Sequence, residues 1–127
     1  MKSVLSGLLA GVLLAAAMPV LAHHSFQAQY DASQKVTLTG VVTKVEWMNP
    51  HARFYMNVKD KSGKVVSWNL ELASPNVLSR MGWNRHSLKP GDEVTVEGAR
   101  AKDGSKYMAN ARVVTLADGK RVFARAK

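Results

Sequence analysis

The fold is indicated most clearly by residues 53–72, which read RFYMNVKDKSGKVVSWNLEL. Apolar and polar residues alternate in two runs, 54–58 and 66–72, and the turn-forming stretch DKSG at 60–63 separates them. Alternation with a period of two is typical of a strand that buries one face, and Asp and Gly between two such runs favour a tight connection. We therefore expect a β-hairpin over this stretch.

A longer strand is expected before the hairpin, over residues 36–48. Its first apolar residues, Val36 and Leu38, share one face, whereas the apolar residues from Val41 onward have the opposite phase. We place the change of phase at Gly40, because glycine permits a bulge and a sharp bend. A long first strand that bends at a glycine favours a small barrel over a flat sheet.

The residues after the hairpin predict one short helix and further strands. Ser74 is a good N-cap, Pro75 suits the first helical position, and Gly82 is a helix stop. Strands are expected after the turn at 89–92, from about residue 107 to 116, and after the turn at 118–119. This order predicts a mainly β fold, a small OB-like barrel of five or six strands with one short helix between strands 3 and 4. An SH3-like barrel and a small sandwich are the alternatives.

The N-terminus has the pattern of an export signal. Residues 1–22 contain one charge, Lys2, then an apolar run, then small residues before Ala22. We expect cleavage after Ala22, with a cut after Ala17 as the alternative. The run is short for a membrane span, so a periplasmic or secreted protein that does not span the membrane is expected. The domain organisation is then a removed signal peptide at 1–22, a mobile N-terminal segment at 23–35 and a single β-barrel domain at 36–127.

The chain is strongly basic and has no cysteine. Its 127 residues carry a net charge of +9, which falls to +8 when Lys2 leaves with the signal. An exported basic protein meets anionic lipid head groups and acidic glycans. Nucleic acid is not an expected partner, because the basic residues are scattered and no nucleic-acid-binding motif accompanies them. The absence of cysteine excludes disulfides and thiolate metal sites, so any metal must take nitrogen or oxygen ligands.

Cleavage after Ala22 would make His23 the first residue of the mature protein. The free α-amine and the δ nitrogen of an N-terminal histidine can chelate one metal together, and a further imidazole can complete the set. His24 and His51 are the further ligands expected, and His86, which we expect at the solvated surface, is the lesser candidate. The set suits Cu(II) or another divalent metal, and its affinity should fall as the pH drops through about 6.5 to 8. It resembles the histidine brace of secreted copper proteins.

A metal-independent binding module is the alternative function. Tyr55, Trp83 and Arg53 are the candidate contacts for an anionic glycan, a lipid head group or an envelope protein. Trp47 and Trp68 lie on the apolar faces of their strands, so we expect them in the core.

No enzymatic activity is expected, since the chain has none of the common hydrolase, nucleotide-binding or metalloprotease motifs. The carboxylates that acid–base chemistry would need are interpreted instead as surface or turn residues: Glu46, Glu71, Asp92 and Glu93.

Several motifs together resemble one family. They are HHSF at 23–26, Tyr30-Asp31, the 40–47 strand followed by Asn49-Pro50-His51, Ser74-Pro75-Asn76 with Gly82-Trp83, and LKPGD at 88–92. This set is similar to an exported bacterial family catalogued as domain of unknown function 6152. The resemblance implies an exported small β domain and no established activity, and it spans nearly the whole mature chain.

Overall fold

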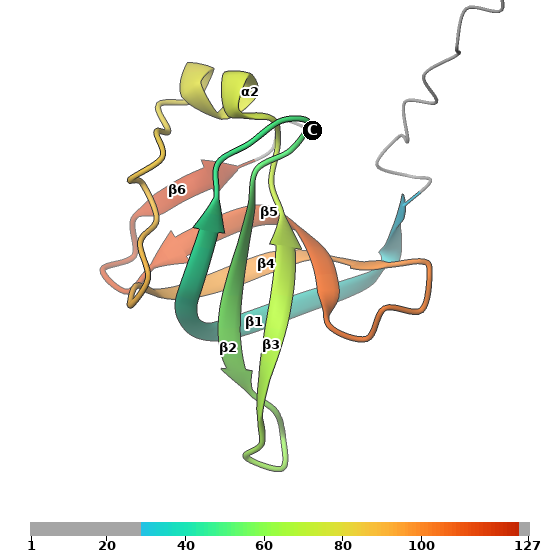
Figure 1. Ribbon diagram of the computed structural model, residues 1–127. Coiled ribbons are helices and arrows are strands. Elements are labelled where there is room, and N and C mark those ends of the chain that lie inside the picture. Colours follow the sequence, from blue (N-terminus) through green and yellow to red (C-terminus); the bar gives the residue numbers. More distant parts are fainter. Residues whose placement is uncertain (1–28, 125–127) are drawn as a thin grey trace, which may run out of the picture.

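The computed structural model describes residues 29–124. In this part of the chain, six strands and one short helix follow one another (Figure 1): β1 (Tyr30–Glu46), β2 (Arg53–Lys59), β3 (Val65–Glu71), α2 (Pro75–Arg80), β4 (Glu93–Ala101), β5 (Met108–Leu116) and β6 (Arg121–Ala124). No helix within these residues is long and apolar enough to cross a membrane.

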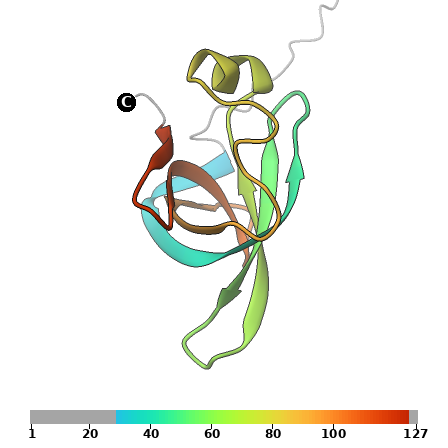
Figure 2. The same ribbon diagram turned by 90° about the vertical axis from the view of Figure 1, so that its left-hand side faces the viewer.

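The strands form one sheet that curls into a near-ring. Their order is β3-β2-β1-β4-β5-β6, and a parallel pairing between β3 and β5 joins the two sides of the sheet. Every other pairing is antiparallel, and β6 extends the sheet beyond the five strands of the ring (Figure 2). This architecture confirms the mainly β, OB-like expectation, including the single short helix between β3 and β4.

β1 differs from its expected form in two respects. It begins at Tyr30, not at residue 36, and pairs first with β4 and then with β2. The early start is not visible in the sequence, because most residues of 31–35 are exposed and show no alternation. The change of phase lies between Val42 and Lys44, not at Gly40, so Val42 is buried and Val41 is exposed.

Gly40 nevertheless marks the place where β1 passes from one partner to the other. It pairs with Val58 of β2 on one side and with Val94 of β4 on the other. A Cβ atom at this position would lie 2.1 Å from the carbonyl oxygen of Asn57. Only a residue without a side chain allows the two strands to approach this closely at the bend.

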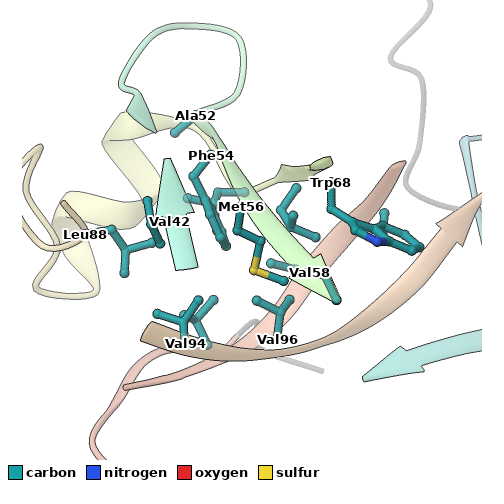
Figure 3. Packing of buried hydrophobic residues seen from close by; sticks show 14 of the residues in the cluster. Val42, Ala52, Phe54, Met56, Val58, Trp68, Leu88, Val94 and Val96 are labelled. Carbon is teal, nitrogen blue, oxygen red and sulfur yellow. The ribbon is translucent and has the colours of Figure 1, made fainter. Parts of the chain in front are cut away.

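The apolar faces of the strands meet inside the ring (Figure 3). Phe54, Met56 and Val96 are fully buried, and Trp68 is also part of this core, as predicted. Trp83 was expected to be an exposed contact residue, and this prediction was wrong. Its side chain is 6% exposed and joins the core cluster with Leu88 from the same segment between α2 and β4.

The short helix follows its expected signals. Ser74 is the N-cap, and its hydroxyl accepts a hydrogen bond from the backbone nitrogen of Val77 at 3.3 Å. Leu78 is the helix's buried residue. Gly82, with a φ of +90°, follows directly after the C-cap, where a left-handed residue commonly ends a helix. The helix thus adds Leu78 to the core.

Candidate functional site

The most unusual group in the described chain is a buried carboxylate, that of Glu71 at the end of β3. Its strand neighbours Leu70 and Leu72 are buried in the core, so the alternation of the strand directs Glu71 to the other face. We interpreted Glu71 from the sequence as a surface charge, and this was wrong. A buried carboxylate is costly unless charged or hydrogen-bonding partners surround it.

Three side chains surround this carboxylate. The Tyr30 hydroxyl donates to Oε2 at 2.5 Å, and Nη2 of Arg53 donates to the same oxygen at 2.9 Å. Nδ1 of His51 lies 2.8 Å from the other oxygen, Oε1. The second guanidinium nitrogen of Arg53 donates to Oδ1 of Asn69 at 3.3 Å. We call Tyr30, His51, Arg53 and Glu71 the Glu71 network.

Strand pairing brings the members of the network together. Arg53 and Glu71 are direct partners across β2 and β3. The residue after His51, Ala52, exchanges backbone hydrogen bonds with Leu72 and Ala73 at 2.8 and 3.0 Å, which continues this pairing past the ends of the strands. The network therefore joins the first residue of β1 and the β1–β2 loop to the end of β3.

Tyr30 is held in its neutral form. Burial raises the pKa of this phenol far above its usual value, and the hydrogen bond to the Glu71 carboxylate raises it further. Tyr30 is 2% exposed but is not part of the main hydrophobic cluster, so its burial serves the contact with Glu71.

This pKa predicts a loss of stability at alkaline pH. The unfolded chain releases the phenolic proton near pH 10, whereas the folded chain keeps it. The stability that neutral Tyr30 contributes is therefore fully present below about pH 10 and declines as the pH rises further. Urea unfolding between about pH 8 and pH 11 should show a steeper decline for the native sequence than for Tyr30→Phe. Tyr107→Phe, which changes an exposed phenol, is the matched control. An equal slope in the native protein and Tyr30→Phe would contradict the prediction.

The network orients His51 through one ring nitrogen, Nδ1, and does not engage the other, Nε2. The contact to Glu71 places the ring proton of the neutral imidazole on Nδ1, which leaves the lone pair on Nε2. Within residues 29–124, Glu71 is the only hydrogen-bonding or charged partner of the ring, and the side chain is 42% exposed. A carboxylate that holds the proton-bearing nitrogen of a histidine is the usual outer support of a metal-binding imidazole.

Of the other candidate residues, Arg53 belongs to this network and Tyr55 pairs with Asn69 beside it. His86 is exposed in the segment after α2, where its backbone nitrogen donates to the Asn84 side chain. Tyr55 is half-buried, and the Lys44 ammonium lies 5.6 Å from the centre of its ring. Arg53 forms an ion pair with Glu71, and its side chain is 28% exposed. His23 and His24 lie outside the described residues.

Metal ligands are sparse in the described part of the chain. Residues 29–124 contain no group of three or more His, Cys, Asp or Glu side chains that could hold a metal ion. His51 and Glu71 form a pair of such side chains, and the Glu71 carboxylate also binds Tyr30 and Arg53.

Comparison with known proteins assigns the chain to a family. The model of a family of unknown function, DUF6152, matches residues 10–110. The chain belongs to this family. The resemblance inferred from the sequence motifs is therefore confirmed, and the segment matched to DUF6152 contains the whole Glu71 network. No curated protein and no solved structure matches the chain.

Proposed function

We propose that this protein is an exported binding protein for a divalent metal, most simply Cu(II), held by the mature N-terminal His23 and by His51. The observation that carries the proposal is the 2.8 Å contact between Nδ1 of His51 and the buried Glu71 carboxylate. It supports His51 as an oriented ligand whose Nε2 lone pair is left for a metal.

The length of the chain allows the two ligands to meet. Tyr30 lies seven positions after His23, and an extended chain spans at most about 3.3–3.6 Å per residue, or roughly 25 Å over this stretch. Tyr30 contacts the same carboxylate that orients His51. The point from which the N-terminal segment departs is therefore well within covalent reach of the His51 ring.

The chemistry of the ligand set favours copper. An α-amine, the Nδ1 of His23 and the Nε2 of His51 would supply three nitrogens, with His24 as a further imidazole. Nitrogen ligands of this kind suit Cu(II) or Ni(II), and Cu(II) is bound more tightly than other divalent first-row metals at most such sites. In the periplasm, such a site would buffer the metal or deliver it to another protein.

A competition titration with Cu(II) tests the proposal. The protein is exported and processed in cells, its N-terminus is checked by intact mass, and it is compared with a version that carries one alanine before His23. We expect one-to-one binding that the added alanine weakens about a hundredfold, because the chelate of amine and imidazole is lost. His51→Ala should weaken it comparably, with its folding checked by thermal melting.

His86→Ala is the matched control for these variants, because it removes an exposed imidazole that is not a member of the Glu71 network. Its affinity for Cu(II) should equal that of the native protein. Equal, weak binding in the native, extended and His51→Ala proteins would overturn the metal function and favour the metal-independent module.

A further inference from the structure

A second feature, separate from the Glu71 network, is a cationic hollow of about 450 Å³ between the start of β1 and the β4–β5 turn. The residues that line it include Arg100, Lys102 and Lys106, together with Ser105 of the turn. Asp31 is the one carboxylate of the lining. Three cationic residues and one acidic residue therefore line the hollow.

Two contacts position the Arg100 side chain, and neither of them is an ion pair. Its guanidinium carbon lies 5.2 Å from the centre of the Trp68 ring, and Nη1 donates to the backbone oxygen of Lys106 at 3.0 Å. No carboxylate of residues 29–124 forms an ion pair with it. An arginine has five N–H donors, so most of those of Arg100 are left for a ligand.

The β4–β5 turn is also fixed. The Asp103 side chain accepts a hydrogen bond from the backbone nitrogen of Ser105 at 2.9 Å. Gly104 occupies the left-handed conformation with a φ of +84°. This geometry sets Lys102 and Lys106 at the two ends of the turn, both lining the same hollow.

Asp31 is already satisfied by its own neighbours. Its carboxylate accepts hydrogen bonds from the hydroxyl and the backbone nitrogen of Ser33 at 2.6 and 2.9 Å. These bonds hold the pKa of Asp31 below its usual value, with a smaller contribution from the charge of Lys102. The carboxylate therefore reduces the positive charge of the hollow but does not cancel it.

We propose that this hollow binds a phosphoryl anion, either free phosphate or the phosphate of a lipid head group. The planar guanidinium of Arg100 matches two oxygens of a phosphate, and the two lysines add point charges on either side. The volume suits a small ligand, since pockets for small molecules usually measure about 300–1,000 Å³. The site goes beyond the proposed metal function and shares no ligand residue with it.

The test pairs two double variants of equal charge. Lys102→Gln with Lys106→Gln removes two cations from the hollow, whereas Lys61→Gln with Lys64→Gln removes two exposed cations from the β2–β3 turn. Calorimetric titration with inorganic phosphate should show binding that weakens about tenfold in the first variant and less than about twofold in the second. Arg100→Lys, which keeps the charge but not the planar fork, should weaken it severalfold, with melting used to confirm that Trp68 remains packed.

A second arm distinguishes the two sources of the anion. Co-sedimentation is measured with phosphatidylcholine vesicles that contain or lack phosphatidylglycerol. Binding to inorganic phosphate identifies the free anion as sufficient, whereas binding to the anionic vesicles alone, lost in the first double variant only, identifies a lipid head group. Equal losses in both double variants would show diffuse attraction to a basic protein and overturn the site. Failure of the native protein to bind either probe would also overturn it.

Discussion

Replacing Glu71 with alanine is expected to lower the free energy of unfolding by about 3 kcal/mol. The substitution removes the acceptor for three donors at once, from Tyr30, Arg53 and His51. The Tyr30 hydroxyl then lies buried with its principal partner missing, and the Arg53 charge loses its ion pair. Removal of one partner from a buried charge pair typically costs more than the pair itself contributes, because the remaining group stays desolvated.

Urea unfolding at neutral pH measures this loss, with Glu97→Ala as the control. Glu97 is an exposed carboxylate on β4, so its removal should change the free energy of unfolding by less than about 0.5 kcal/mol. A change as small as this in Glu71→Ala would contradict the role assigned to the network.

Glu71→Gln separates the structural role from the proposed metal role. Glutamine keeps the size of the side chain and an oxygen that accepts from Tyr30, but it no longer draws His51 as a charged acceptor. If the metal is bound through His51, affinity for Cu(II) should fall about 10- to 100-fold, as is usual when the outer support of a metal ligand is changed. A stability change with no change in copper affinity would assign Glu71 to the fold alone.

The second large effect is expected at Gly98 of β4. A Cβ atom there would lie 1.7 Å from the carbonyl oxygen of Asn110 on β5, and a backbone atom cannot move aside as a flexible side chain can. Gly98→Ala should therefore lower the free energy of unfolding by about 3 kcal/mol, at the upper end of the usual cost of overpacking. Thermal or urea unfolding of the purified variant measures it.

Gly104→Ala is the informative control for Gly98→Ala. A Cβ atom at Gly104 meets nothing within 4 Å, but the residue has a φ of +84°. Its substitution should cost only about 1 kcal/mol of backbone strain. Equal losses at the two positions would show that the close approach of β4 to β5 relaxes without penalty.

The neighbourhood of Gly98 explains why this approach is so close. The register between β4 and β5 shifts between Glu97 and Gly98, and the Asn110 side chain accepts a hydrogen bond from the backbone nitrogen of Ala99 at 3.2 Å. Asn110 is buried, so its amide is part of the folded sheet and not a surface group. Gly98 and Asn110 together shape the irregular part of the ring.

Local patterns predicted the β architecture well, and for a physical reason. The turn at 60–63 fixes the register of the hairpin, because it leaves Lys59 opposite Val65 and therefore Arg53 opposite Glu71. Side-chain alternation then assigns Met56 and Trp68 to the core face. These relations depend only on residues that are close in the sequence.

The sequence patterns failed where distant segments meet. Tyr30 is buried by its contact with Glu71, 41 positions away, and no local periodicity reports such a contact. Trp83 has no strand pattern around it, so its burial depends on how the segment between α2 and β4 lies against the barrel. The hairpin register alone is enough to predict that Arg53 lies opposite Glu71. The contacts of His51 and Tyr30 with Glu71 depend on the three-dimensional fold and could not be predicted in this way.

The turn of the hairpin between β2 and β3 is a suitable site for attaching a label. Its turn projects from the barrel at the end opposite the β1–β2 loop that contains His51 (Figure 1). The Asp60 carboxylate braces this turn by accepting from Ser62 and Lys64, while the side chains of 61–64 are exposed. A fluorophore or a surface tether attached here would leave the proposed mature N-terminus at His23 unmodified. An affinity tag fused directly ahead of His23 would instead remove the free α-amine on which the proposed metal site depends.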